Sequence, residues 1–363
     1  MRAYAFVHTA LFIGSIAAIG ATAVARTWPD GAPPAIPDAG RVAAGDVARD
    51  FESLYDERFP VRTFGTNVWA AVQYLLFREG RPGVIVGEHG WLYTAEEFRG
   101  WPQAQARIDA HLDLIASVHR RMAGSGSALV VALVPAKARV YPEHRGDETP
   151  ASVHDGLYRQ ARGALLARGI MAPDLLTAMQ RCKTRSEVFL RTDTHWTPRG
   201  AQCAAEEIAL NIAPLRAPDT PMQDFVTEHG APAAHAGDLT RFLPLAPHFA
   251  ALLPAPDTLT PSTTFAAGQN DLLADTPTPA TVLIGTSYSA DPAWNFDGAL
   301  KTALREDVLN LAESGHGPFA PMRRYLESGV GPRARVVVWE LPERYLPMPD
   351  SAMPNEPSTG EST

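Results

Sequence analysis

The sequence predicts an α/β fold, a three-layer sandwich with a mainly parallel central sheet between layers of helices. Residues 128–134 form a continuous apolar run that Pro135 ends, and such runs are typical of central parallel strands buried on both faces. Further short apolar runs alternate with amphipathic segments of helical periodicity, the pattern of βα units. The 363 residues, 45% hydrophobic and 20% charged, suit a folded protein with one large domain or two smaller ones.

The individual helices and strands follow from the segments of helical periodicity and from the short apolar runs. Apolar residues at helical spacing predict helices over 46–59, 65–78, 104–122, 155–168, 198–211, 295–305 and 316–328. Short apolar runs predict further strands at 281–284, 308–311 and 335–339. Gly87 and Gly90 at the centre of 84–93 indicate a hairpin. Pro198 suits the first turn of its helix, where the missing N–H costs nothing.

The N-terminus carries an export signal. An apolar run extends from Ala3 to about Ala25, and its last three residues match the small-residue pattern of a signal-peptidase site. The run also reaches the roughly 20 residues that a membrane-spanning helix needs. Residues 1–25 are therefore predicted to be a signal peptide or a signal anchor, with a buried N-terminal helix as the remaining alternative. We expect an exported protein that is either soluble after cleavage or tethered to the membrane by residues 3–25.

Composition sets the other boundaries. Residues 26–45 contain four prolines with several Gly and Ala, which indicates a linker. One domain is expected over 46–346. Within it, residues 214–278 lose periodicity and collect Pro, Ala, Thr and Asp, so they are predicted to form an insertion or lid. Residues 347–363 are rich in Pro, Ser and acidic residues, which predicts a disordered tail.

The charge balance excludes one class of partner. The net charge is -8 at pH 7, so the chain has no basic excess with which to neutralise phosphates. We therefore expect no nucleic-acid partner. Local Arg and Lys residues can still line a cleft for an anionic acceptor.

The two cysteines, Cys182 and Cys203, flank the segment that contains Asp193 and His195. In an exported chain, a disulfide between them would pin that segment. Two small buried side chains that never meet are an equally good interpretation. Two cysteines alone do not make a zinc site.

Asp193 and His195 form an Asp-X-His pair just before a predicted helix start. At this spacing the carboxylate can accept the Nδ1 hydrogen of the imidazole, which would hold its tautomer and stabilise the imidazolium that forms in a reaction. Asp193 could instead be a turn residue, and Thr197 an N-cap of the following helix. A metal site with Asp193 and His195 as ligands is a further alternative, but no third ligand stands out, so we expect no metal.

Ser287 follows the predicted strand at 281–284 and precedes a helix, where open α/β sheets place their ligands. Gly285 would allow a tight turn, and the N–H of Ser287 would be a natural oxyanion donor. A turn or cap hydroxyl is the plain alternative, and Ser289 is the competing nucleophile. Together with Asp193 and His195, Ser287 would complete a serine-type acyl-transfer site: nucleophile, base and orienting carboxylate.

Several ordered stretches resemble those of the periplasmic alginate O-acetyltransferases, the AlgJ/AlgX group of SGNH-like proteins. These stretches are residues 86–93, 134–137, 141–142, 193–197, 285–289, 294–296 and 339–345. The similarity spans roughly 83 to 346, and its widely separated motifs make it far more specific than any one of them. It implies an SGNH-hydrolase-like sandwich. The chain ends soon after the last stretch, without the C-terminal carbohydrate-binding module of AlgX, so its layout is closer to AlgJ.

The resemblance implies that Ser287 is the nucleophile, His195 the general base and acid, and Asp193 its orienting partner. In ordinary SGNH hydrolases the serine block comes first and the Asp-X-X-His block last. Here the order is inverted and the spacing is Asp-X-His, which the group shares as a circularly permuted arrangement. Geometry and roles define a triad, so chain order does not constrain it.

The implied reaction moves an acetyl group through Ser287 onto hydroxyls of an exopolysaccharide, alginate or a related polymer, in the periplasm. A membrane-bound O-acyltransferase (MBOAT) partner would supply the acetyl donor, so no soluble cofactor is expected. The candidate substrate contacts are Lys137, Arg139, Tyr288, Trp294 and Asn295. Aromatic faces suit sugar rings and cations suit uronate carboxylates, although each of these residues could equally serve the fold alone.

Two rival functions remain open at this point. With water as the acceptor, the same three residues would make a polysaccharide acetylesterase, because transferase and esterase differ in how well the site excludes water from the acyl-enzyme. A non-catalytic polysaccharide-binding or assembly factor on the same scaffold is the second rival. The presence of all three residues, Ser287, His195 and Asp193, weighs against it.

Overall fold

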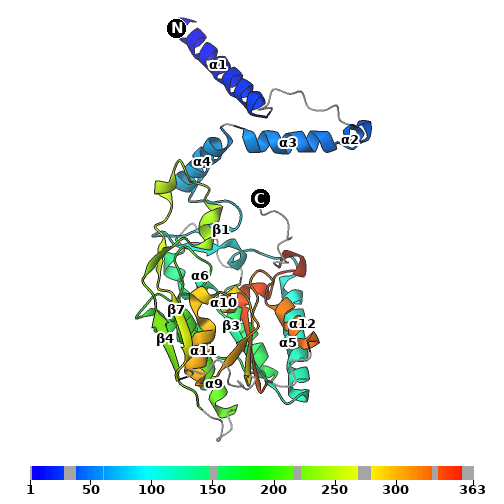
Figure 1. Cartoon of the computed structure of the whole chain (residues 1–363), viewed down its shortest axis with the longest axis vertical. Helices are drawn as coiled ribbons and strands as arrows, with labels where there is room; N and C mark the ends of the chain where they lie inside the picture. Colours follow the sequence, from blue (N-terminus) through cyan, green and yellow to red (C-terminus); the bar gives the residue numbers. More distant parts are fainter. Residues whose placement is uncertain are drawn as a thin grey trace. The chain divides into compact units, whose positions relative to one another are not determined.

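The computed structural model describes residues 2–27, 38–59, 61–146, 154–215, 222–268, 279–328 and 334–353 (Figure 1). The chain divides into two compact units. One comprises Met1–Arg78 with Leu243–Leu253, and the other comprises Glu79–Phe242 with Pro254–Thr363. The second unit holds the sheet, so the compact sheet domain begins at Glu79 and not at residue 46.

The N-terminal part of the first unit is helical. Its elements are α1 (Arg2–Thr27), α2 (Ala39–Ala43), α3 (Asp46–Arg58), α4 (Arg62–Val72) and a π-helical turn, η1 (Gln73–Phe77). Helices α3 and α4 confirm the two predicted from apolar spacing, and α2 lies inside the expected linker. Among the residues that the structure describes, no helix is both long enough and apolar enough to cross a membrane.

A four-stranded sheet forms the centre of the second unit. Its strands lie in the order β3 (Ala128–Val134), β10 (Val336–Pro342), β8 (Thr281–Ile284) and β9 (Val308–Asn310), and every neighbouring pair is parallel. All seven residues of β10 and all four of β8 are buried. The apolar runs therefore identified the strands correctly, because a strand covered on both faces needs apolar side chains on both.

Helices cover both faces of this sheet (Figure 1). Alternate side chains of β3 point to opposite sides: Leu129, Val131 and Leu133 belong to one core cluster, and Val130, Ala132 and Val134 to the other. The first cluster includes side chains of α5 (Ala104–Gly124), α7 (Leu157–Ala167) and α12 (Phe319–Glu327). The second includes those of α8 (Leu175–Lys183), α9 (Pro198–Ile212) and α11 (Phe296–Leu304). The predicted three-layer α/β sandwich is confirmed.

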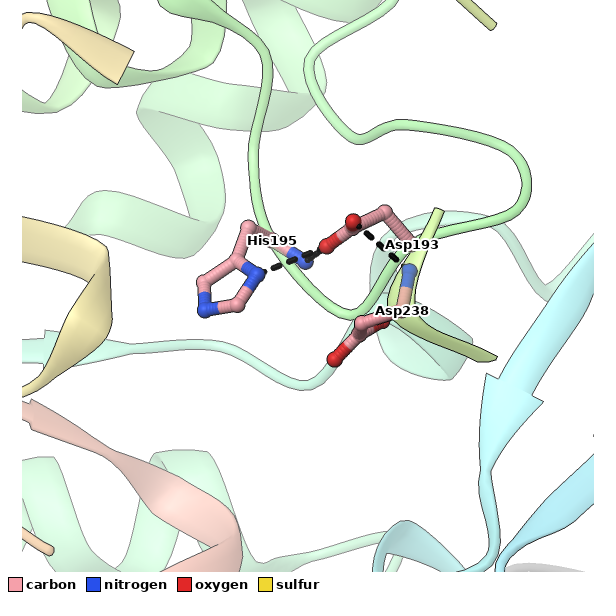
Figure 2. A group of neighbouring side chains, drawn as sticks. All are labelled: Asp193, His195 and Asp238. Atoms are coloured by element: carbon pink, nitrogen blue, oxygen red, sulfur yellow. Dashed lines mark hydrogen bonds and ion pairs between the residues drawn. The ribbon is translucent and has the colours of Figure 1, made fainter. Parts of the chain in front are cut away.

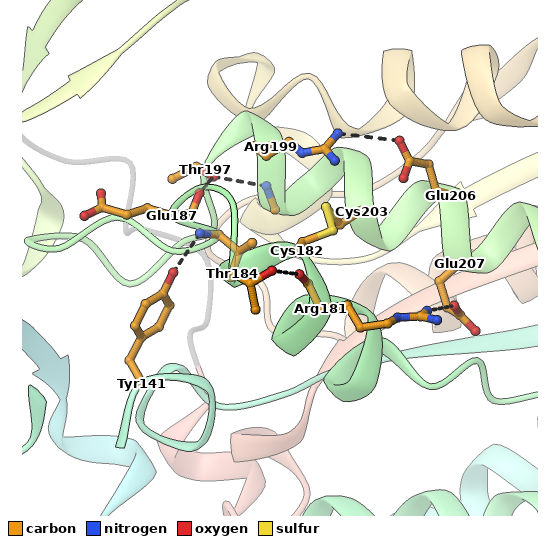
Figure 3. Close-up of a disulfide and its surroundings, with 12 residues drawn as sticks. Tyr141, Arg181, Cys182, Thr184, Glu187, Thr197, Arg199, Cys203, Glu206 and Glu207 are labelled. Atoms are coloured by element: carbon orange, nitrogen blue, oxygen red, sulfur yellow. Dashed lines mark hydrogen bonds and ion pairs between the residues drawn. A yellow bond between two sulfur atoms is a disulfide. The ribbon is translucent and has the colours of Figure 1, made fainter. Parts of the chain in front are cut away.

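Cys182 and Cys203 form a disulfide that joins α8 to α9 (Figure 3). Of the two interpretations left open by the sequence, the pairing is therefore correct. The closed loop spans a sequence separation of 21 residues and contains Asp193 and His195. In the chain-entropy model, closing a loop of this size stabilises the fold by about 3 kcal/mol.

The insertion at 214–278 contains regular structure where it is described. Two antiparallel ladders form, one from β4 (Phe225–His229) with β7 (Ser262–Ala266) and one from β5 (Ala233–His235) with β6 (Asp257–Leu259). A 3-10 helix, η5 (Asp238–Phe242), follows β5. These strands are too short and too exposed to show a clear alternation in sequence, which is why they were not predicted.

The ends of the sheet domain also differ in detail from expectation. The predicted hairpin at 84–93 forms as β1 (Val84–Val86) antiparallel to β2 (Leu92–Thr94). The predicted disordered tail begins with ordered residues, because Met348 is fully buried in the core and Asp350–Ala352 forms a 3-10 helix. Residues 354–363 of that tail lie outside the described residues.

Candidate active site

Ser287 lies at the carboxyl end of β8, in a turn fixed by the neighbouring strand. Gly285 and Thr286 lead from the strand into a short helix, α10 (Ser287–Ala290). The buried carboxylate of Glu340, on β10, accepts the N–H of Thr286 at 2.6 Å and its hydroxyl at 3.0 Å. A Cβ at position 285 would collide with that carboxylate, so the close approach requires glycine.

The Glu340 carboxylate also distinguishes the two candidate nucleophiles, because it binds only one of the two serine hydroxyls. Ser289 is buried and donates its hydroxyl to Glu340 at 3.0 Å, whereas Ser287 is only half-buried. Ser289 therefore holds the turn, and Ser287 is the serine that is free to react. Burial raises the pKa of Glu340, against the opposing effect of its N–H and hydroxyl donors.

Sequence reasoning missed the role of Glu340. The available signal was a carboxylate inside the otherwise apolar strand at 336–341, because a buried acid is retained only where hydrogen-bond donors meet it.

His195 bridges Ser287 and Asp193. Its Nε2 lies 2.7 Å from Ser287 Oγ. On the other side of the ring, Nδ1 lies 2.6 Å from Asp193 Oδ1 (Figure 2). The Nδ1–H donates to the carboxylate, which leaves Nε2 as an acceptor for the serine proton. The structure thus brings together the three residues singled out from sequence, which we call the Ser287–His195–Asp193 relay.

The carboxylate of Asp193 accepts four N–H groups. Oδ1 accepts the Nδ1–H and the backbone N–H of His195, the latter at 2.9 Å. Oδ2 accepts the Nε2–H of His235 and the backbone N–H of Asp238, both at 3.0 Å. Burial alone would raise the pKa of Asp193, but the hydrogen bonds and charge of His195 and the bond from His235 hold it well below its ordinary value. Asp193 is therefore an ionised acceptor at neutral pH.

The insertion holds the rest of the loop 191–195. Asp257, on β6, accepts the backbone N–H groups of Arg191 and Thr192 at 2.9 Å each and the Thr192 hydroxyl at 2.6 Å. Asp238, at the start of η5, accepts the N–H of Thr194 at 2.8 Å and its hydroxyl at 3.0 Å. Three residues of the insertion, His235, Asp238 and Asp257, thus contact successive residues of this loop.

Sequence reasoning also missed these three residues. The only signal available was a set of acidic and histidine residues in an aperiodic region, and nothing in the sequence showed where that region would fold.

The geometry around Asp193 and His195 also bears on the alternative of a metal site, which the sequence left open. One ligand atom from each of Asp193, His195 and Asp238 lies within 4.8 Å of the others (Figure 2), so the third group that the sequence did not reveal is Asp238. The oxygens of both carboxylates already accept N–H or O–H donors from the protein. A cation would have to displace those donors, so the arrangement suits a hydrogen-bonded relay better than a metal centre.

The structure buries Lys137 among protein groups, whereas the sequence suggested a contact with substrate. Its side chain is 1% exposed, and Nζ donates to the carbonyl oxygens of Leu92 at 2.6 Å and of Arg191 and Asp193 at 2.9 Å each. Burial lowers the pKa of Lys137 to about 8, against the opposing charge of Glu97. All three of its N–H donors are used, so Lys137 secures the backbone of the loop 191–195.

Two aromatic residues that were predicted to bind sugar instead contact the Ser287–His195–Asp193 relay and its backbone. Trp294 is 2% exposed; its ring stacks on His195 at 5.0 Å and its Nε1–H donates to the Ser287 carbonyl at 3.1 Å. Tyr288 is 1% exposed, and its hydroxyl donates to the Thr194 carbonyl at 2.7 Å. Neither ring presents a face to solvent, so neither is available to stack on a sugar.

The remaining two candidates are also engaged within the protein. Arg139 pairs with Glu343 through two bonds of 2.8 and 3.0 Å. Asn295 donates from Nδ2 to Thr264 Oγ1 at 2.9 Å and adopts a left-handed conformation, φ 49°, before α11. Both are half-buried, and their polar groups contribute to packing between elements.

Comparison with known proteins is consistent with this geometry. Residues 84–343 match the family model of the SGNH hydrolase-like domain of the acetyltransferase AlgX. The probable alginate O-acetylase AlgJ of Pseudomonas putida is 50% identical over 311 residues, 84% of this chain and 80% of the relative. The AlgJ of Pseudomonas aeruginosa is 47% identical over 317 residues, 84% of this chain and 81% of the relative.

Solved structures give the same grouping. The O-acetyltransferase domain of Pseudomonas putida AlgJ aligns with a TM-score of 0.69 and 47% identity, over 75% of this chain and 95% of that chain. Pseudomonas aeruginosa AlgX aligns with a TM-score of 0.56 and 22% identity, over 73% of this chain and 63% of that chain, and supports the fold alone. This chain therefore belongs to the SGNH hydrolase-like acetyltransferase family of AlgX, among its AlgJ-like members.

Proposed function

We propose that this protein is a periplasmic alginate O-acetyltransferase that carries the acetyl group on Ser287. The observation that carries the proposal is the continuous contact from Ser287 Oγ to His195 Nε2 at 2.7 Å and from His195 Nδ1 to Asp193 at 2.6 Å. This is the distance at which a base takes a hydroxyl proton. The alginate acceptor is proposed from the AlgJ relatives, which are named as alginate O-acetylases.

In the first half-reaction, Ser287 Oγ attacks the carbonyl carbon of the acetyl donor while His195 Nε2 takes the hydroxyl proton. The carbonyl electrons move onto oxygen, where the Ser287 backbone N–H can stabilise them. Among the described residues this N–H has no hydrogen-bond acceptor. When the bond to the leaving group breaks, His195 returns the proton to that group and the acetyl ester of Ser287 remains.

In the second half-reaction, a hydroxyl of the polymer attacks the acetyl ester. His195 takes the hydroxyl proton as the new C–O bond forms, and gives it to Ser287 Oγ as the ester bond to serine breaks. The acetyl group leaves on the sugar and the free serine is regenerated. Asp193 stays ionised throughout and stabilises the imidazolium in both steps.

The chain order of the relay supports a finer proposal on the fold. Asp193 and His195 precede Ser287, the reverse of the order in ordinary SGNH hydrolases, and we infer a circularly permuted arrangement. The relay geometry is compatible with this order, because the loop 191–195 and the turn at Ser287 meet at the carboxyl edge of the sheet although 92 residues separate His195 from Ser287.

The acceptor is tested with purified protein, p-nitrophenyl acetate as acetyl donor and alginate oligosaccharides. We expect acetylated oligosaccharide by mass spectrometry with the wild type and none above background with Ser287→Ala. Acetate release without acetylated sugar would contradict the transferase and favour an esterase. Acetylation at the wild-type rate by purified Ser287→Ala would contradict Ser287 as the nucleophile. Inactive purified wild type, together with unchanged polymer acetylation in cells that produce only Ser287→Ala, would favour a non-catalytic role.

The compartment and the donor are further parts of the proposal. Export by residues 1–25 places the domain in the periplasm, soluble or tethered, and a membrane-bound O-acyltransferase supplies the acetyl group. Fractionation of cells that produce the full chain tests the first part. Deletion of the gene for the MBOAT partner tests the second, because polymer acetylation is expected to stop while the domain still acetylates oligosaccharides from p-nitrophenyl acetate.

A further inference from the structure

The insertion places a second histidine on the carboxylate of Asp193. His235, the last residue of β5, donates from Nε2 to Asp193 Oδ2 at 3.0 Å, while His195 donates from Nδ1 to Oδ1 at 2.6 Å. One buried carboxylate therefore joins two imidazoles. We propose, on the basis of the function proposed above, that His235 is a positioning residue. It sets how strongly Asp193 orients the His195 ring and stabilises the His195 imidazolium.

His235 is held in place by groups on several sides. Its ring and that of Trp294 form a T-shaped pair, with centroids 5.8 Å apart and an interplanar angle of 84°, and the same indole stacks on His195 at 5.0 Å. In the β5–β6 ladder, His235 lies opposite Asp257, which itself accepts N–H groups of the loop 191–195. The imidazole is therefore fixed by its ladder, by an aromatic edge and by the carboxylate that it contacts.

The contact fixes the tautomer of His235. Asp193 is ionised and can only accept, so Nε2 of His235 must carry the hydrogen. That N–H offsets part of the negative charge that would otherwise stabilise the His195 imidazolium. His235 therefore competes with His195 for the negative charge of the same carboxylate. Together with the backbone N–H of Asp238, it also restricts rotation of the Asp193 carboxylate, because both carboxylate oxygens are bonded.

Other charged groups also face this pair. Asp257 comes from β6, Asp238 from η5, and the Lys137 ammonium contacts the Asp193 carbonyl. None of the three is itself substituted in a variant at position 235, so a change at His195 is assigned to the loss of His235.

The direct test is the pKa of His195, measured by NMR on the full chain with isotope-labelled histidine. In His235→Ala we expect the pKa of His195 to rise, because a donor to the shared Asp193 carboxylate is lost. His235→Gln keeps an N–H donor without a charge and should recover most of the wild-type value. His229→Ala, at an exposed histidine of the same insertion, is the matched control and should change nothing.

An unchanged or lowered pKa of His195 in His235→Ala would overturn the inference. If that variant unfolds, the two amide variants test the inference. It is supported if His235→Gln keeps the wild-type pKa of His195 while His235→Asn raises it, because the shorter amide of Asn reaches Asp193 less well. Equal pKa values in these two amide variants would then overturn it.

Kinetics separate this inference from the proposed function. With p-nitrophenyl acetate, we expect His235→Ala to lower kcat about 10-fold with little change in KM, the usual scale for a residue that orients another, and His235→Gln to restore it. The NMR titration does not require Ser287 chemistry and is repeated in a Ser287→Ala background. If the pKa of His195 rises in His235→Ala but Ser287→Ala is fully active, only the proposed function is contradicted. If the pKa of His195 is unchanged in His235→Ala and Ser287→Ala is inactive, only the role of His235 is contradicted.

Discussion

Ser287 and His195 meet at one hydrogen bond, but different parts of the protein hold them. The serine turn is fixed by Glu340, a fully buried residue of the central strand β10. The loop that carries His195 is fixed largely by residues of the insertion, including Asp238 and Asp257. The proposed nucleophile is thus built into the sheet, whereas the proposed base is aligned by an element added outside it.

This difference predicts how the two sides respond to substitution. Central strands open only with the whole domain, while short exposed ladders open locally at low free-energy cost. Changes on the serine side should therefore appear first in the free energy of unfolding. Changes on the insertion side should appear first in kcat, because a small misplacement of a catalytic group costs activity before it costs stability.

The largest expected effect is that of Asp193→Asn, which keeps the size of the side chain and removes its charge. Activity should fall about 10³- to 10⁴-fold, because the amide cannot stabilise the imidazolium or hold its tautomer. The measurement is kcat/KM for acetyl transfer to alginate oligosaccharides. A loss below 10-fold would mean that His195 does not depend on this carboxylate.

The same variant carries a pH signature. The folded-state pKa of Asp193 is held below its ordinary value, so the stability it contributes is fully present above about pH 4 and is lost as the pH falls. Urea denaturation from about pH 5 to about pH 2 should therefore show a steeper loss of stability in the wild type than in Asp193→Asn. Parallel curves would contradict the assignment.

Glu340→Ala should have the largest effect on stability. It leaves the Thr286 N–H and the Thr286 and Ser289 hydroxyls without their buried acceptor, which costs roughly 3–5 kcal/mol of unfolding free energy. Glu340→Gln keeps an acceptor oxygen and should lose less. Urea denaturation gives both values. A loss of activity in Glu340→Ala without a fall in the free energy of unfolding would contradict the difference expected between the serine turn and the loop that carries His195.

Removal of the disulfide should come next. Cys182→Ala with Cys203→Ala opens the loop that contains His195, and the expected cost is about 3 kcal/mol. Thermal denaturation measures it, and reduction of the wild type should approach the same midpoint. Activity of the folded variant should remain close to that of the wild type, since Lys137 and the insertion still hold the loop. A wild-type melting midpoint would contradict a stabilising role.

Asp238→Ala should have a smaller effect, and mainly on catalysis. It removes the acceptor for the Thr194 N–H and hydroxyl, so kcat should fall about 10-fold, while unfolding free energy should fall by about 1 kcal/mol. Asp224→Ala, at an exposed aspartate of the same insertion, is the matched control. If Asp238→Ala were as destabilising as Glu340→Ala, the insertion would be part of the same cooperative unit as the sheet.

The smallest expected effect is that of metal removal. The oxygens of Asp193 and Asp238 already accept protein donors, so dialysis against EDTA should leave acetyl transfer unchanged. Loss of activity that Zn²⁺ or another divalent cation restores would contradict the hydrogen-bonded relay and assign Asp193, His195 and Asp238 to a metal centre.

The sequence was sufficient for the sheet and for the relay, for two different reasons. Residues 128–134 are apolar throughout because β3 is covered on both faces, and this pattern is local. Ser287 and the Asp193–His195 pair could be identified because each sits in a short motif beside a strand end or helix start.

Contacts made by the insertion could not be predicted in this way. Asp257 and Asp238 act on a loop that lies more than forty residues earlier in the chain, and no periodicity marks them. The sequence could not show the burial of two of the expected substrate contacts for a related reason: it shows that Tyr288 and Trp294 are aromatic, but not that their rings are buried against His195.

The most direct test of the account is to trap the acyl-enzyme. The protein is mixed with p-nitrophenyl acetate, quenched in acid within one turnover and digested, and the acetylated peptide is sequenced by mass spectrometry. We predict one acetyl group on Ser287, strongly reduced in His195→Ala and discharged when alginate oligosaccharides are added before the quench. Acetyl on Ser289 or elsewhere, or acetylated oligosaccharide formed by Ser287→Ala, would contradict the account.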